Sequence, residues 1–410
     1  MKKLLLVLLI LSLFINHLNA NEKDLNIIQK DKKEYRLLDK ESIQTRQQSQ
    51  KYDWISPIDL SGNIGRNHSF SDENSRNLNN KNTKSASIGF TQSIFESGGI
   101  GFKMDYADNR FKYEMLSWEN QNSQLIYTIY NTLLDIKKLK LAINQNDYRI
   151  VNKDIELIIK KIQYEAGKTD IIELNNAIMS KNLILKEEIA LKNSLKEKEQ
   201  ELAKYTDLKY DEIEILDFQE TNKDIFLDKN YSILEADAKV EMLNSEYKIK
   251  KSQYLPKLSL SAKASYSNQD EKFNSMINDT NKDDASSSGS LILTMPLYDY
   301  TKSSKIQESK IEVLKQKALV NDLKNETAFE YEQIFTKIDT YLKQNETINK
   351  NIKLYEELIG ANQISSEAGM TSKYDLEILE NTKTINEFDI LINKINILQQ
   401  YAKLYFKIKN

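Results

Sequence analysis

The feature that most constrains the fold of this chain is an internal repeat with a period of about 200 residues. Thr91–Glu96 (TQSIFE) and Thr294–Asp299 (TMPLYD) each hold a Thr, an apolar–aromatic pair and a final acid. Further along the chain, Glu165–Thr169 (EAGKT) and Glu367–Thr371 (EAGMT) share four of five residues. Because both landmarks recur in the same order at nearly the same offset, the sequence predicts two copies of one long unit. Solenoid repeats, by contrast, are only about 20–50 residues long.

Each copy opens with two stretches in which apolar residues alternate with small polar ones. The apolar positions are Ile58, Leu60, Gly62 and Ile64; Ala86, Ile88, Phe90 and Ile94; Leu258, Leu260, Ala262, Ala264 and Tyr266; and Leu291, Leu293, Met295 and Leu297. A period of two over about ten residues predicts β-strands with one apolar face, long enough to cross a bilayer when tilted. Two half-buried hairpins on a soluble sheet are the alternative. The polar segments 66–84 and 268–288 are predicted to be long external loops.

After each strand pair the hydrophobic period changes to alternating steps of three and four. Ala328, Tyr331, Phe335, Ile338 and Leu342 follow this spacing. Neither Gly nor Pro interrupts residues 102–166 or 301–359, which predicts two helices of about 60 residues each, packed as coiled coils. Gly167 and Gly369 end these helices and second helices follow at once, so each EAG-x-T sequence is predicted to form the tip of a helical hairpin.

These patterns divide the chain into seven segments. They are a signal peptide at 1–20, an N-terminal helical segment at 21–53, the first strand pair at 54–98, the first long hairpin at 99–206 with its tip at 165–169, a charged linker and helix at 207–253, the second strand pair at 254–300, and the second long hairpin at 301–410 with its tip at 367–371. The signal peptide is indicated by Lys2 and Lys3, by an apolar run too short to span a bilayer, and by Ala20 at the cleavage position. A retained membrane anchor is the alternative.

The composition leaves few residues for catalysis. The chain has no Cys and two His, His17 and His68, so disulfides, thiolate nucleophiles and sulfur-ligated metals are excluded. We therefore expect no enzyme activity, no cofactor and no metal site. The net charge of −3 argues against nucleic-acid binding, which needs a concentrated basic face. Residues 167–169 (GKT) resemble the end of a phosphate-binding loop, but Ile162 stands where that loop requires Gly, and a predicted helix precedes it.

Four strands cannot close a membrane barrel by themselves, because the smallest closed barrels have about eight strands. An open sheet edge in lipid would leave backbone hydrogen-bonding groups unsatisfied. The predicted strands therefore require two or more chains in one barrel, with the helices continuing from one side as a tube. The predicted fold class is a mixed α/β membrane protein built from two internal repeats.

This combination resembles the TolC family of outer-membrane efflux proteins over essentially all of the predicted mature chain. The resemblance is carried by the two-copy arrangement, the two glycine tips, Tyr254–Leu260 (YLPKLSL), Met295–Asp299 (MPLYD) and Gln92–Gly99 (QSIFESGG). It implies a homotrimer in which each chain contributes four strands to a 12-stranded β-barrel. The long coiled-coil hairpins would form a periplasmic α-barrel of twelve helices.

The resemblance further implies an outer-membrane channel with a large periplasmic portion. Such a channel is the exit duct of a tripartite efflux pump or a type I secretion system. Its implied partners are a periplasmic adaptor (membrane fusion) protein, an inner-membrane transporter and outer-membrane lipid, with no nucleic acid. The alternative is a structural periplasmic coiled-coil or surface protein without channel activity.

The resemblance also assigns roles to named positions. The adaptor-docking tips are Glu165, Ala166, Gly167, Lys168 and Thr169, and Glu367, Ala368, Gly369, Met370 and Thr371. Glu173 and Asp375 match acids that narrow the periplasmic aperture of related channels, where three carboxylates near a symmetry axis favour cations. The alternative is that both acids only suit the dipole of a helix start. Ile378 stands where a second family acid falls, and the lack of Cys separates this chain from the acylated branch of the family.

Overall fold

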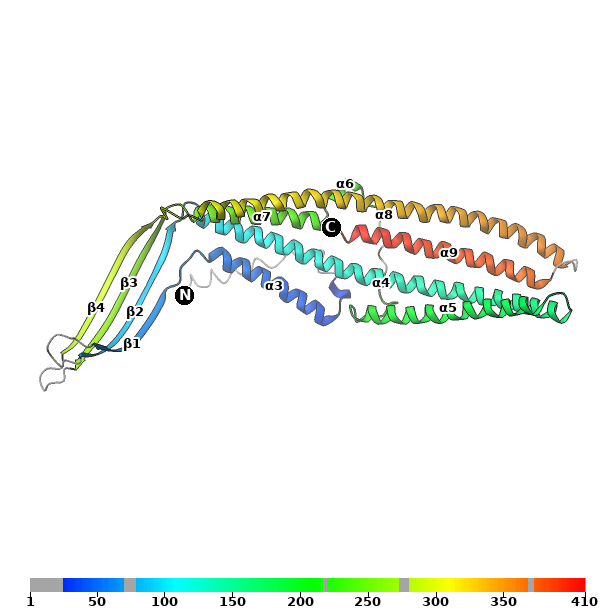
Figure 1. The fold of residues 1–410 in the computed structure, drawn as a ribbon, viewed down its shortest axis with the longest axis horizontal. Helices are drawn as coiled ribbons and strands as arrows, with labels where there is room; N and C mark the ends of the chain where they lie inside the picture. The colour runs from blue at the N-terminus through cyan, green and yellow to red at the C-terminus, as the bar shows by residue number, and fades with distance from the viewer. Residues whose placement is uncertain are drawn as a thin grey trace, which may run out of the picture. The chain divides into compact units, whose positions relative to one another are not determined.

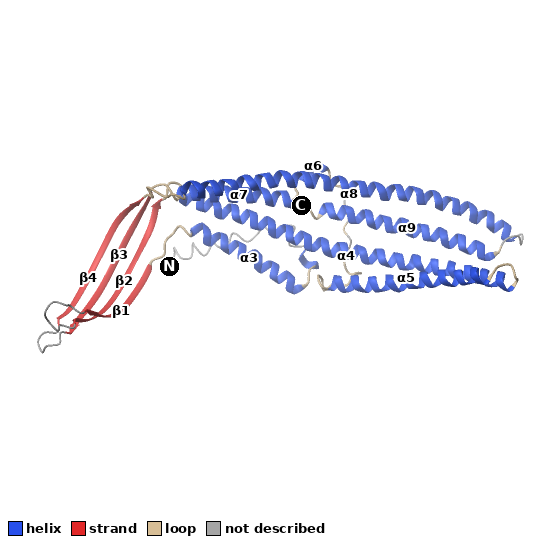
Figure 2. Ribbon diagram, in the orientation of Figure 1, coloured by secondary structure: helices blue, strands red, loops and turns tan. Residues whose placement is uncertain are grey.

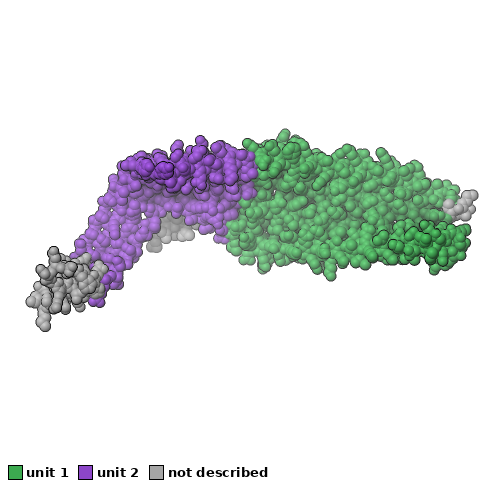
Figure 3. Space-filling view, in the orientation of Figure 1, with its two compact units in different colours: residues 1–40, 116–234, 321–410 green, residues 41–115, 235–320 purple. Residues whose placement is uncertain are grey.

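The computed structural model describes residues 25–69, 79–214, 216, 218, 220–272, 280–367 and 372–409. The predicted signal peptide at 1–20 lies outside these residues. Two compact units make up the chain (Figure 3). Unit 1 combines residues 1–40, 116–234 and 321–410, whereas unit 2 combines residues 41–115 and 235–320.

Unit 2 contains a four-stranded antiparallel sheet, formed by β1 (Asp59–Ser69), β2 (Asn79–Phe95), β3 (Lys257–Lys272) and β4 (Thr280–Thr294) (Figure 1). The strand order is β1-β2-β3-β4, so the first copy of the repeat supplies one half of the sheet and the second copy the other half. β2 and β3 pair directly across the two copies. Strands β1 and β4 are therefore the two edges of the sheet within the described residues.

The register of the sheet places the predicted apolar positions on one face. Leu60 lies opposite Ile88, and Ile88 lies opposite Ala264. Their face is open to solvent in the single chain, where Leu60 and Leu293 are 79% and 71% exposed. On the other face, serine hydroxyls pair between strands, with Oγ–Oγ distances of 2.8 Å for Ser61–Ser87 and for Ser265–Ser286. The sheet is thus apolar on one side and hydroxyl-rich on the other.

The strands are longer than the sequence pattern predicts. The expected loops at 66–84 and 268–288 are wrong over most of their length, because β1 continues to Ser69, β2 begins at Asn79, β3 continues to Lys272 and β4 begins at Thr280. These extensions are polar on both faces, so they lack the alternation from which a strand is recognised. Polar pairs between strands stabilise them instead: the Asn268 side-chain amide donates to the Asp283 carboxylate at 2.6 Å.

Two long helical hairpins account for most of the helical residues (Figure 2). In the first hairpin, α4 (Gly99–Glu165, 67 residues) is followed by α5 (Ile171–Ala203). In the second, α8 (Lys302–Glu367, 66 residues) is followed by α9 (Lys373–Tyr405). The long helices α4 and α8 contribute to both units. Their lengths follow from the stretches without Gly or Pro, since these two residues are the strongest helix breakers.

Shorter elements complete the chain. They are η1 (Leu25–Ile27), α3 (Lys30–Tyr52), α6 (Lys223–Asp228) and α7 (Tyr231–Ser252). No helix among the described residues is both long and apolar enough to serve as a transmembrane helix.

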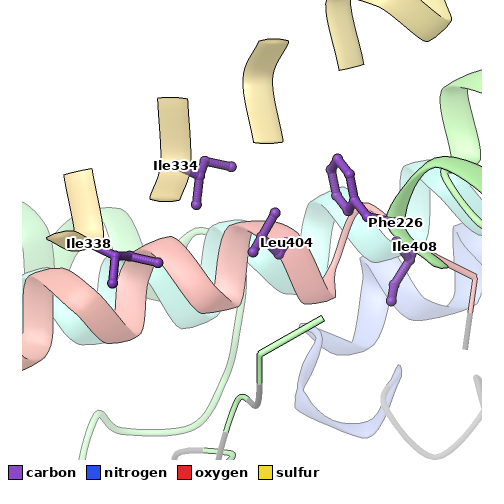
Figure 4. Close-up of a cluster of buried hydrophobic side chains, with 5 residues drawn as sticks. All are labelled: Phe226, Ile334, Ile338, Leu404 and Ile408. Atoms are coloured by element: carbon purple, nitrogen blue, oxygen red, sulfur yellow. The ribbon is translucent and has the colours of Figure 1, made fainter. Parts of the chain in front are cut away.

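A cluster of buried apolar side chains in unit 1 joins α6, α8, α9 and the C-terminal segment (Figure 4). It consists of Phe226 from α6, Ile334 and Ile338 from α8, Leu404 from α9, and Ile408. Fully burying one such side chain contributes about 1.5–3 kcal/mol. A single bridge between Asn230 and Ile408 ties the chain end to the start of α7. The cluster therefore anchors the polar linker between the two copies of the repeat.

The fold class is confirmed: a mostly helical chain with two long hairpins, two structural repeats and one four-stranded antiparallel sheet.

Candidate functional site

The first hairpin tip is a turn that requires glycine. Gly167 has a φ of +67°, in the left-handed region that side chains with a Cβ disfavour. Its N–H donates to the Tyr164 carbonyl at 3.0 Å, and the Lys168 N–H donates to the Gln163 carbonyl at 2.8 Å. This pair of bonds is the Schellman arrangement that ends helices. Residues 165–168 are exposed, and nothing lies within 4 Å of a Cβ placed on Gly167, so the tip presents a small, open surface.

Helix α5 begins directly after this tip. Asp170 is its N-cap, and Oδ1 accepts from the backbone N–H of Glu173 at 2.9 Å. The Glu173 carboxylate lies 3.1 Å from the Lys160 ammonium on α4. Glu173 thus closes the hairpin through an ion pair and occupies the first turn of a helix, where acids suit the helix dipole.

The second tip is described only at its two ends. Helix α8 ends at Glu367, whereas Ala368, Gly369, Met370 and Thr371 lie outside the described residues. Ser372 caps α9, and its hydroxyl accepts from the Tyr374 N–H at 3.2 Å.

Asp375 differs from Glu173 in its surroundings. Its side chain is exposed in the first turn of α9. It forms no ion pair with any cation in the part of the chain that the structure describes. The two acids singled out from the sequence are thus unequal: Glu173 is neutralised locally, and Asp375 keeps a free charge.

A comparison with protein families finds a match to part of the chain. Residues 224–403, which include all of α8 and most of α9, match the sequence profile of the family described as "Outer membrane efflux protein". The resemblance to the TolC family is confirmed. The matched family consists of outer-membrane proteins, so the predicted location, the outer membrane with a large periplasmic portion, is confirmed. No curated protein sequence matches this chain significantly.

Solved structures of outer-membrane channels share the fold. The outer membrane protein VceC of Vibrio cholerae superposes with a TM-score of 0.72 at 12% identity, covering 93% of this chain and 94% of that one. The CmeC outer membrane channel of Campylobacter jejuni gives a TM-score of 0.67 at 12% identity, covering 92% and 84%. The open state of the MtrE outer membrane channel of Neisseria gonorrhoeae gives 0.66 at 12% identity, covering 91% and 85%.

In this TolC-like chain the two hairpins are joined by a seam of amide side chains that the sequence did not reveal. On α4, the Gln145 amide donates to the Asp389 carboxylate on α9 at 2.7 Å. Further along the seam, the Gln399 amide donates to Asp135 at 2.8 Å. Gln145 and Gln399 are buried, and buried amides stay stable only when hydrogen-bonded. Their partners lie more than 200 residues away, so local spacing could not pair them.

A tight junction connects the sheet to α4. Ser97 and Gly98 both adopt positive φ, at 51° and 87°. The Ser97 hydroxyl donates to the Pro256 carbonyl at 2.7 Å. A Cβ on Gly99 would come within 2.8 Å of the Ser252 hydroxyl. The QSIFESGG motif of the sequence therefore marks a turn whose residues fit directly against the start of the second strand pair.

The buried Glu96 carboxylate stabilises the same junction. It lies 3.0 Å from the Lys103 ammonium. Burial raises its pKa, but hydrogen bonds from Lys103 and Ser93 and the charges of Lys103 and Lys257 outweigh burial, so the pKa of Glu96 falls below its ordinary value. Glu96 is thus held as a carboxylate at neutral pH.

Proposed function

We propose that three copies of this chain form a channel that conducts substrates across the outer membrane. The observation that carries the proposal is the sheet: its four strands have free edges at β1 and β4 within the described residues, and its two faces differ in polarity. Free edges in lipid must be paired, because unsatisfied backbone groups there cost several kcal/mol each. Twelve strands from three chains would pair every edge, with the apolar face toward lipid and the hydroxyl face toward a water-filled lumen.

The two helical hairpins of each copy would continue this lumen as a periplasmic tunnel. Long helices with narrow apolar stripes favour side-by-side packing between copies. Exposed apolar residues on α5 and α8, such as Ile172, Leu183 and Leu354, support such packing because a single chain leaves them uncovered.

The tips would dock the periplasmic adaptor of a tripartite efflux pump or type I secretion system, which an inner-membrane transporter completes. The first tip offers Ala166 and Gly167 with open space around them. Small residues let the backbone of a partner hairpin approach closely. Asp375 and Glu173 would lie near the periplasmic aperture, where Asp375 supplies the unpaired charge.

Two measurements on the full-length protein test the proposal. Outer-membrane fractions are expected to yield a trimer that heat dissociates, and the purified trimer is expected to conduct ions in a planar lipid bilayer. A monomer recovered from the soluble periplasm, without conductance, would instead support a structural coiled-coil protein.

A further inference from the structure

The hydroxyl-rich face of the sheet carries one row with two opposite charges. Asp59 lies opposite Gly89, Gly89 opposite Lys263, and Lys263 opposite Ser288, so one row crosses all four strands. The flanking rows on this face hold only hydroxyl residues: Ser61, Ser87, Ser265 and Ser286 on one side, and Thr91, Ser261 and Ser290 on the other. The charged row is therefore isolated between two uncharged rows of hydroxyl residues.

Asp59 and Lys263 keep their charges available. Both side chains are exposed, and neither forms an ion pair with any residue in the described ranges. Neighbouring strands lie about 4.8 Å apart, so these two positions, two strands apart, are separated by about 10 Å at the backbone. The two side chains do not pair with each other in the described residues, so each charge faces the space above the sheet.

Gly89 leaves a hollow between the two charges. The hollow has a volume of about 400 Å³ and is lined by Asp59, Ser61, Ser87, Thr91, Ser261 and Lys263 among others. A Cβ on Gly89 would come within 3.0 Å of the Ala262 carbonyl oxygen. The neighbouring backbone thus disfavours a side chain at position 89. Because no side chain lies between Asp59 and Lys263 in this row, a solute in the hollow can contact the Asp59 carboxylate and the Lys263 ammonium directly.

We infer that Asp59 and Lys263 form a charge-balanced ring, which keeps the lumen of the channel from preferring either cations or anions at this level. The inference rests on the proposed function, because it requires this face to line the lumen of a trimer. There the row becomes a ring of three carboxylates and three ammonium groups. Rings of charged side chains select ions, and equal numbers of both signs cancel within a Debye length of about 10 Å at 0.1 M salt. This ring therefore contributes little net selectivity in the native channel, and the loss of either charge removes the balance.

Lys257 and Asp284 are the other charges on this face within the described side chains, and they lie toward the two ends of the sheet. Each is separated from the Asp59–Lys263 row by at least one row of hydroxyl residues. Because they have opposite signs, they do not bias the central row toward either kind of ion.

The test measures the permeability ratio of K⁺ to Cl⁻ for the full-length trimer in a planar bilayer under a tenfold KCl gradient. Lys263→Glu is expected to raise the ratio about twofold or more, and Asp59→Lys to lower it by a similar factor, because each reverses three charges of one ring. The double variant Asp59→Lys/Lys263→Asp is expected to restore the native ratio. Lys263→Gln, a milder change, is expected to shift the ratio in the same direction as Lys263→Glu and serves if the charge reversal prevents assembly.

Lys84→Glu is the matched control. Lys84 lies opposite Ile64, so it belongs to the apolar face of the same sheet, and its reversal is expected to leave the ratio unchanged. If the native trimer conducts but Lys263→Glu and Lys263→Gln both keep the native ratio, the inference is wrong while the channel function stands. An equal shift of the permeability ratio by Lys84→Glu would also overturn the inference, since charges on the apolar face would then affect selectivity as much as charges on the hydroxyl face. A native protein without any conductance would overturn the channel function and this inference together.

Discussion

At the residue scale, Gly167 is a position where a substitution is expected to affect adaptor docking much more than the stability of the fold. Asn tolerates the left-handed conformation better than other residues with a Cβ, and open space surrounds this position. Gly167→Asn is therefore expected to destabilise the trimer by less than about 1 kcal/mol, yet to abolish export because its side chain blocks close approach of an adaptor. Thermal unfolding of the trimer and an export assay in cells measure the two effects.

Gly360 provides the control for this prediction. It lies exposed within α8, where nothing contacts a Cβ placed on it. Gly360→Ala is expected to stabilise the helix by about 1 kcal/mol and to leave export unchanged. Normal export by Gly167→Asn would remove the docking role of the first tip.

A second prediction at the residue scale concerns how the ion pairs of Glu330 make stability depend on pH. Burial raises its pKa, but hydrogen bonds from Lys403 and Lys407, with distances of 2.8 and 2.5 Å, lower it below its ordinary value overall. A lowered pKa in the folded state means that the pairing stabilises the fold above the ordinary Glu pKa and is lost as pH falls through the lowered value. Glu330→Gln is expected to cost about 1–2 kcal/mol near pH 7 and less at pH 3, as measured by unfolding at both pH values.

The exposed pair Lys343–Asp339 is the control for Glu330. Its side chains are 71% and 58% exposed, and exposed ion pairs contribute little. Asp339→Asn is therefore expected to leave stability unchanged at both pH values. Equal losses in the two variants would show that Glu330 acts only as a surface charge.

At the scale of elements, we expect the two faces of β1 to differ in how well they tolerate a charged substitution. Leu60 lies on the apolar face and Ser61 on the hydroxyl face of the same strand. Leu60→Lys is expected to cost up to about 2–4 kcal/mol in the membrane, whereas lumen-facing substitutions are tolerated. The yield of heat-dissociable trimer should therefore fall for Leu60→Lys and persist for Ser61→Lys. If Ser61→Lys lowered the trimer yield and Leu60→Lys did not, the hydroxyl face of β1 would have to face lipid and the apolar face the lumen.

The long helices and the apolar strand faces were predictable because local periodicity encodes them. The 3-4 spacing and the absence of Gly and Pro predicted two helices of about 60 residues, and α4 and α8 have 67 and 66. The outer parts of the strands were not predictable, since their residues are polar on both faces. The amide seam was not predicted either. Glutamine is common on protein surfaces, so Gln145 gives no signal by itself, and only the packing of α4 against α9 brings Asp389 within hydrogen-bond distance of it.

At the scale of the whole molecule, threefold symmetry would turn single acids into rings. Asp375 is exposed and without an ion-pair partner in the described residues, whereas Glu173 is paired with Lys160. Three unpaired carboxylates near one axis repel each other and attract cations, whereas paired ones are neutralised. From the sequence we expected the same role for both acids. The difference was not predictable, because the ion-pair partner of Glu173 lies on the preceding helix of the hairpin.

Cation block of the conducting trimer distinguishes the two acids. A multivalent cation such as Mg²⁺, added on the side of the helices, is expected to reduce the current of the native channel. Asp375→Asn is expected to weaken this block at least about tenfold in the half-blocking concentration, because removing three unpaired charges lowers the local cation concentration. The double variant Lys160→Gln/Glu173→Gln removes the ion pair but keeps the local net charge, so it is expected to change the half-blocking concentration by less than about twofold. If instead this double variant weakened the block as much as Asp375→Asn, then the Lys160–Glu173 ion pair would have to open in the assembled trimer, and both acids would contribute to the ring.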